Sequence, residues 1–119
     1  MESLQENRNL QPLKAQLRLT LDEHDERYLN RMLNQRENLI RLINQLSANP
    51  TSLLNLTEDA KEALTAAGQK PPSALLLLGT EAAIDRLRHA KELQDTLIRD
   101  FLTDSLGASV TTALEQLGA

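Results

Sequence analysis

The fold of this chain is decided by residues 20–50, which read TLDEHDERYLNRMLNQRENLIRLINQLSANP. Apolar residues recur through this stretch at helical spacing, in two neighbouring rows. The first row is Tyr28, Met32, Leu39, Ile43 and Leu46, and the second is Leu29, Leu33 and Ile40. This apolar stripe is wider than the seam of a two-stranded coiled coil. The pattern therefore predicts a long bundle helix with neighbouring helices on two sides.

Both ends of this predicted helix carry recognisable signals. Thr20-Leu21-Asp22-Glu23 resembles a capping box, in which the Thr20 hydroxyl accepts a hydrogen bond from the Glu23 N–H and the Glu23 carboxylate reaches back to Thr20. At the other end, Pro50 disfavours helical dihedrals in Asn49 and cannot donate to the preceding turn. We expect the helix to begin near Thr20 and to stop at Asn49-Pro50.

The composition of all 119 residues supports an all-α fold. The chain has 26 leucines against four isoleucines and one valine, with a single tyrosine, a single phenylalanine and no tryptophan. Strands usually draw on the β-branched and aromatic residues that are scarce here, whereas leucine keeps much of its rotamer freedom in a helix. The length is that of one ordinary globular domain.

The rest of the chain divides into shorter predicted segments. The polar residues 1–9 predict a flexible N-terminal segment. From residue 10 we expect a single domain, an antiparallel helical bundle of about four helices, two long and two or more short. We expect a short helix from Leu10, a helix capped by Thr57 that closes at Gly68, and a helical turn at 74–78. A long helix over 81–106 and a short one over 109–117 follow.

Charge and residue content exclude several classes of function. There is no cysteine, so disulfides, cysteine-bound zinc and thiol nucleophiles are excluded. With 13 basic and 17 acidic side chains the formal charge is −4, and acidic residues interleave the arginines of both long helices. We therefore expect solvated mixed-charge faces and no nucleic-acid binding, especially since Tyr28 and Phe101 are the only aromatics.

The chain also lacks the sequence patterns of membrane or secreted proteins. Its longest apolar run, Ala74–Leu78, is five residues, whereas about 20 are needed to cross a bilayer. The N-terminus has no basic patch followed by an apolar core, so it does not read as a secretory signal. We expect no membrane insertion and a cytoplasmic location.

Two histidines are the candidate metal ligands, but their surroundings favour another role. His24 lies in the acidic run 22–26, and His89 follows Asp85 by one helical turn. Neither has the spacing of a recognised metal motif, and acidic residues in a first helical turn complement the helix dipole without any ligand. The four glycines are isolated, so no phosphate-binding loop is present. We expect no metal and no cofactor.

One enzymatic alternative rests on a resemblance over about 20 residues. The residues that carry it are Leu17, Arg18, Leu21, Asp25, Leu29, Leu33 and Arg36. This stretch resembles the first helix of the all-helical chorismate mutases, and the resemblance implies that Arg18 and Arg36 hold substrate carboxylates. Those enzymes also use a lysine from this helix, whereas here no lysine follows Arg36 until Lys61.

Our first hypothesis is a small helical protein-binding module: an adaptor, a secretion or assembly chaperone, or an oligomerisation subunit. The four leucines of 75–78 are expected to be mostly buried, yet a small bundle cannot always bury every short leucine-rich segment. An exposed one would attract another protein or a second copy of the chain, giving a homodimer. The candidate contact residues are Leu53, Leu54, Leu56, Leu75, Leu76, Val110, Leu114 and Leu117.

Overall fold

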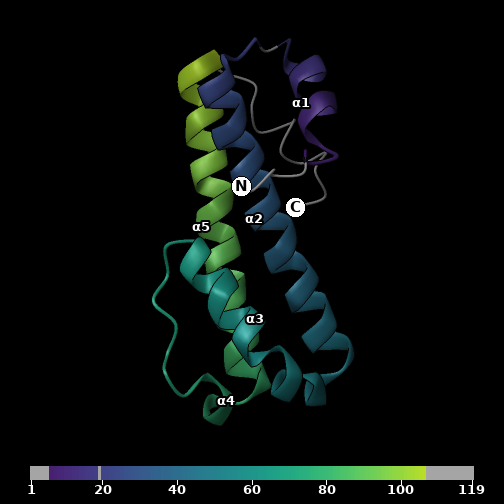
Figure 1. Ribbon diagram of the computed structural model, residues 1–119, viewed down its shortest axis with the longest axis vertical. Coiled ribbons are helices and arrows are strands. Elements are labelled where there is room, and N and C mark those ends of the chain that lie inside the picture. The colour runs from purple at the N-terminus through teal and green to yellow at the C-terminus, as the bar shows by residue number, and fades with distance from the viewer. Residues whose placement is uncertain (1–5, 19, 107–119) are drawn as a thin grey trace. The chain divides into compact units, whose positions relative to one another are not determined.

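The computed structural model describes residues 6–18 and 20–106, and the regular elements in these ranges are all helices (Figure 1). They are α1 (Leu10–Leu17), α2 (Glu23–Ala48), the 3-10 helix η1 (Pro50–Ser52), α3 (Leu53–Ala66), α4 (Leu75–Leu78) and α5 (Thr80–Leu106). The predicted all-α helical bundle is confirmed. The predicted helix over 109–117, with Val110, Leu114 and Leu117, lies outside the described residues.

The chain divides into two compact units. Unit 1 combines residues 1–34 with 96–119, and unit 2 consists of residues 35–95, so α2 and α5 each contribute to both. Each unit has its own apolar core. The core of unit 1 is Leu10, Leu13, Leu29, Met32, Leu33, Ile98 and Leu102. The core of unit 2 is Leu39, Leu42, Leu46, Leu53, Ala60, Ala63, Leu64, Ala67, Leu75, Ala83, Leu87 and Ala90.

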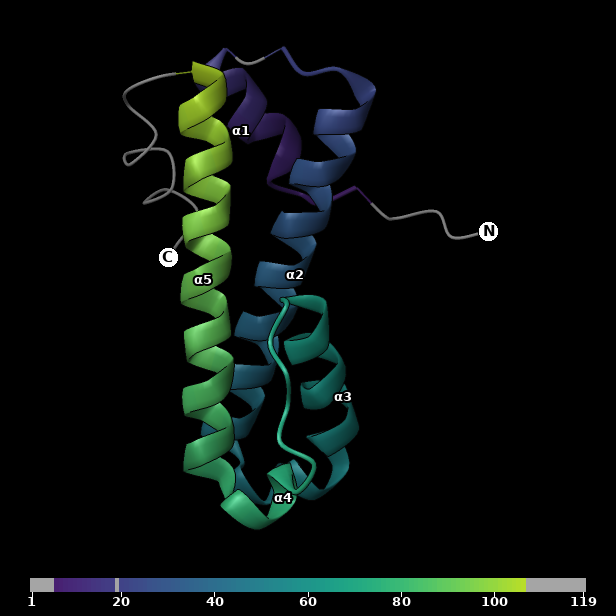
Figure 2. The same cartoon turned by 90° about the vertical axis from the view of Figure 1, so that its left-hand side faces the viewer.

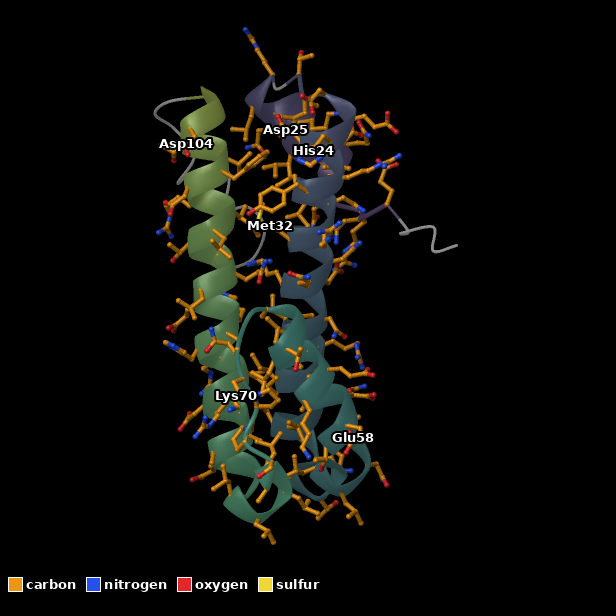
Figure 3. All side chains as sticks on the ribbon, turned by 60° about the vertical axis from the view of Figure 1, so that its left-hand side comes forward. His24, Asp25, Met32, Glu58, Lys70 and Asp104 are labelled. Atoms are coloured by element: carbon orange, nitrogen blue, oxygen red, sulfur yellow. The ribbon has the colours of Figure 1, made fainter. Side chains whose placement is uncertain are left out.

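Unit 1 packs α1 and the last turns of α5 against the first turns of α2. The chain reverses after α1, which therefore runs antiparallel to α2 (Figure 2). Met32 lies between α2 and α5 in Figure 3, and it is buried in the core of this unit. Tyr28 and Phe101 meet edge to face, with ring centroids 5.2 Å apart. Phe101 packs against the core of unit 1, whereas Tyr28, which belongs to the apolar row predicted to face the core, is 39% exposed.

Asn7 fixes the chain before α1 to the surface of α2. Its backbone N–H donates to Asn30 Oδ1 at 2.6 Å, and its Nδ2 donates to Asn34 Oδ1 at 2.9 Å. Its own Oδ1 accepts the Asn9 N–H at 2.9 Å. Asn7 is only 4% exposed. The polar composition of residues 1–9 predicts a flexible segment, but Asn7 within it is held by long-range hydrogen bonds.

The start of α2 differs from the predicted capping box. The helix begins at Glu23, and its cap is Asp22, whose Oδ1 accepts the Asp25 N–H at 2.8 Å. Thr20 lies two residues before this cap, so the assignment of Thr20 as the cap was wrong. Both side chains are of types that cap helices well. Their chemistry alone therefore does not decide which of the two occupies the capping position.

We expect Asp22→Ala to lower the free energy of unfolding by about 1 kcal/mol, the usual loss of a helix cap. Thr20→Ala is the matched control, and it is expected to change stability by less than about 0.5 kcal/mol, as exposed substitutions do. Urea unfolding of both variants, followed by circular dichroism, measures the difference. A larger loss for Thr20→Ala than for Asp22→Ala would contradict the assignment of Asp22 as the cap.

In unit 2, α3 begins earlier than predicted. Pro50 ends α2 as expected and opens η1, after which α3 starts directly at Leu53. Thr57 was predicted to cap this helix, and that assignment was wrong. Its hydroxyl instead donates to the Leu53 carbonyl at 2.6 Å, inside the helix. Residues 53–56 are therefore the first turn of α3.

Gly68 ends α3, as predicted, because it adopts a left-handed φ of +80°. The Gln69 N–H donates to the Leu64 carbonyl at 2.8 Å and the Gly68 N–H donates to Thr65 at 3.0 Å, which is a Schellman motif. Residues 67–74 then return along α3, so that α3 and α5 run in the same direction, both antiparallel to α2 (Figure 2). After α4 ends at Leu78, α5 begins at Thr80, one residue before the predicted start at 81, and the Thr80 hydroxyl donates to the Pro50 carbonyl at 2.7 Å.

Candidate functional site

The structure separates the predicted partner-contact leucines into buried and exposed ones. Leu53 and Leu75 belong to the core of unit 2, at 4% and 0% exposure, and Leu56 is half-buried. Leu54 and Leu76 are exposed, at 69% and 42%. Among the described candidates, Leu54 and Leu76 are therefore the exposed ones, and Leu54 alone exposes more than half of its surface.

Two more exposed leucines, Leu77 and Leu78, were not among the predicted contacts. Leu77 is 85% exposed and Leu78 is 48% exposed, so the expectation that residues 75–78 are mostly buried was wrong. The physical reason lies in α4 itself. Four residues make one full helical turn, and side chains spaced by about 100° cannot all face one core. Leu75 is the member of α4 that is fully buried.

We call Leu54, Leu76, Leu77 and Leu78 the leucine patch. Leu54 is in the first turn of α3, and the other three form α4, which packs against α3. Both segments lie at the end of unit 2 where α5 begins (Figures 1 and 2). The patch is therefore an apolar surface built at one end of a unit whose core is already filled by other leucines.

A buried ionic cluster occupies the contact between α2 and α5 in unit 2. Arg36 Nε lies 2.5 Å from Asp95 Oδ1, and Lys91 Nζ lies 2.7 Å from Asp95 Oδ2. Arg36 is 4% exposed and the neighbouring Gln94 is 2% exposed. Within the described residues, Arg36 Nη2 and Gln94 Oε1 are buried without a hydrogen-bond partner. The expectation that the arginines of α2 lie on a solvated face was thus wrong for Arg36.

The two arginines suggested by the chorismate mutase resemblance lie in different units. Arg18, in unit 1, is exposed and ends α1 with a left-handed φ of 52°. Arg36, in unit 2, is already paired with the carboxylate of Asp95. The guanidinium of Arg36 therefore has a structural partner within the chain.

The two histidines are exposed and belong to separate units. His24 lies beside Asp25 in the first turn of α2 (Figure 3), and His89 lies on α5 within unit 2. The described part of the chain contains no group of three or more histidine, cysteine, aspartate or glutamate side chains placed to hold a metal. None of the described helices is long and apolar enough to cross a membrane.

Unit 2 also contains a pocket of about 390 Å³ between the C-terminal end of α3, the segment that follows it and the first half of α5. Lys70, in that segment, lies beside α5 in Figure 3. The pocket is lined by Leu64, Gln69, Lys70, Ala82, Asp85, Arg86 and His89. Sequence reasoning missed it, because Gln69 and Lys70 come from a link that carries no periodic pattern.

Comparison of the chain with models of known families, with curated proteins and with solved structures returns no match.

Proposed function

We propose that this chain is a small helical protein-binding module that contacts its partner through the leucine patch. The observation that carries the proposal is the exposure of Leu77 and Leu54, at 85% and 69%. Single exposed apolar residues are ordinary on protein surfaces, whereas a contiguous group of large ones marks an interaction site. Here four exposed leucines lie on two segments that contact each other, which supports an interaction site at this end of unit 2.

The placement of the patch supports a helix or a second copy of the chain as the partner. Leu76, Leu77 and Leu78 project from a single turn, and Leu54 extends the apolar surface onto α3. A partner helix that lays an apolar stripe on these leucines would remove them from water. Burying apolar area contributes about 25 cal/mol per Å², so a few leucines supply much of the affinity of a modest interface.

The protein's role would then be that of an adaptor, an assembly or secretion chaperone, or an oligomerisation subunit. These roles differ in what covers the patch. A chaperone or adaptor covers it with another protein, and an oligomerisation subunit covers it with an identical patch in a two-fold contact.

We expect Leu54→Ser combined with Leu77→Ser to weaken partner binding at least tenfold, because both side chains would be central to the contact. Truncating a central contact residue commonly costs 2 kcal/mol or more, and about 1.4 kcal/mol corresponds to tenfold in affinity. Sedimentation equilibrium measures self-association. Binding to another protein is measured by pull-down with quantitative mass spectrometry, followed by titration of the purified partner. The thermal midpoint of the variant is expected to stay close to that of the unmodified chain, because both leucines are exposed.

Leu93→Ser is the matched control. Leu93 is also an exposed leucine of unit 2, at 36%, but it lies 13 residues into α5, about 20 Å along the helix from its start. Binding that falls equally in the control and in the patch variant would contradict the proposal. A chain that stays monomeric and retains no partner in the unmodified form would contradict it as well.

A further inference from the structure

We propose that the pocket of unit 2 binds a small organic phosphate, a phosphate monoester with an apolar substituent. This site is separate from the leucine patch and does not depend on the function proposed for it. Two features of the pocket support the proposal, its donors and its apolar wall, whereas its single carboxylate opposes anion binding.

The donors come from two segments that α3 and α5 bring together. Arg86 and His89 lie on α5 at helical spacing with Ala82, so they share one face of that helix. Lys70 and Gln69 come from the segment after Gly68. Within the described part of the chain, neither the Lys70 nor the Arg86 side chain has an ion-pair partner. Two cations without an ion-pair partner among the described residues therefore line the pocket, together with one carboxylate, Asp85.

The charge and shape of these donors favour a phosphate over a carboxylate. A phosphate monoester carries about −1.5 to −2 charges at neutral pH and has three strong acceptor oxygens. Arginine binds such a group with two parallel hydrogen bonds, and lysine adds a point charge. Gln69 and His89 offer further N–H donors. Two cations and the N–H donors of Gln69 and His89 match a dianion better than a monoanionic carboxylate.

The remaining lining residues define the rest of the ligand. Leu64 and Ala82 give the pocket an apolar wall, against which an aromatic or aliphatic substituent can pack. The volume of about 390 Å³ is within the range of small-molecule sites. Asp85 is the one acidic lining residue; its side chain is 78% exposed and lies 3.9 Å from Arg88. Its carboxylate repels an anion, so it lowers the affinity.

The test is calorimetric titration of the full chain with phenyl phosphate at low salt. We expect saturable binding that is tighter than for inorganic phosphate, which lacks the apolar group, and tighter than for benzoate, which carries one charge. Affinity is expected to fall as sodium chloride is added, because salt screens exposed charges. The amide resonances of Ala82, Arg86 and His89 are expected to shift in the same titration.

Arg86→Gln is expected to weaken phenyl phosphate binding about tenfold, which is the usual size of one lost charge-assisted contact. Asp85→Asn is expected to tighten it. Arg99→Gln is the matched control, since Arg99 is an exposed arginine of the same helix that does not line the pocket. The leucine patch variants are expected to bind phenyl phosphate normally, which separates this site from the patch.

Three results would overturn the proposal. The first is the absence of saturable phenyl phosphate binding by the unmodified chain. The second is equal weakening by Arg86→Gln and Arg99→Gln, which would show a general charge effect. The third is benzoate binding as tight as that of phenyl phosphate, which would rule out the phosphate as the recognised group.

Discussion

Asp95→Ala is expected to lower the free energy of unfolding by about 3–5 kcal/mol, the usual cost of removing one partner from a buried ion pair. Asp95 is the common partner of Arg36 and Lys91, whose side chains are 5% and 18% exposed. Removing the carboxylate leaves the Arg36 guanidinium in the core contact between α2 and α5 without a counter-charge. Arg36 Nη2 already lacks a hydrogen-bond partner, so little remains to compensate the loss. Urea unfolding monitored by circular dichroism measures the change.

Glu23→Gln provides the matched control for this experiment. Glu23 pairs with Arg27 one helical turn away at the surface, where both side chains are more than 70% exposed. Exposed pairs contribute about 0.2–1 kcal/mol, so this variant should retain nearly all of the stability. The contrast between the two variants isolates the effect of burial on an ion pair.

A second variant distinguishes the buried charge from a general disturbance of the helix contact. Arg36→Met combined with Asp95→Leu removes both charges of the Arg36–Asp95 pair and keeps apolar side chains of similar length, while Lys91, whose side chain is 18% exposed, turns its ammonium to solvent. Such replacements of buried ion pairs are often neutral or stabilising. We expect this double variant to be clearly more stable than Asp95→Ala. A double variant as unstable as Asp95→Ala, or an Asp95→Ala loss of less than about 1 kcal/mol, would contradict the role given to the pair.

The sequence predicted the helix boundaries well where a single residue type dictates the local backbone. Pro50 ends α2 because it cannot continue the helix, and Gly68 ends α3 because it adopts a positive φ. Gly79 and Thr80 mark the change from α4 to α5 for similar reasons. These signals act within a few residues, so they can be read from the sequence without knowledge of the tertiary fold.

The predictions that failed concerned residues whose role depends on distant partners or on competing local choices. Arg36 reads as one of several solvated arginines, but its partner Asp95 is 59 residues away. Thr20 and Thr57 are both good capping residues, yet Asp22 caps α2 and Thr57 lies inside α3. Capping propensity indicates which residues are able to cap a helix. The tertiary path of the chain determines which of them occupies the capping position.

Part of the leucine patch coincides with residues that the sequence singled out. The sequence pointed to the leucine-rich segments 53–56 and 75–78, and Leu54 and Leu76 within them are exposed. It did not single out Leu77, the most exposed of the group, although four leucines in one helical turn must leave some in solvent. The pocket could not be predicted, because it requires the segment after Gly68 to lie against α5.

Leu42→Ala is expected to lower the free energy of unfolding by about 2–5 kcal/mol, the range for truncating a buried leucine. Leu42 is 0% exposed and lies in the core of unit 2, although the two apolar rows that define the predicted stripe of α2 do not include it. Truncation removes apolar contacts and leaves a cavity that the neighbouring leucines fill only partly. Thermal and urea unfolding both measure the loss.

Leu97→Ala is the matched control, because Leu97 also lies inside a long helix but is 45% exposed. We expect its effect to stay within about 0.5 kcal/mol, since few packing contacts are lost and alanine favours the helix. Leu42→Met keeps most of the side-chain volume, so its loss should stay below about 1.5 kcal/mol. Equal losses for Leu42→Ala and Leu97→Ala would contradict the core of unit 2 described here. A loss for Leu42→Met as large as for Leu42→Ala would show that side-chain shape, and not buried volume, governs packing at this position.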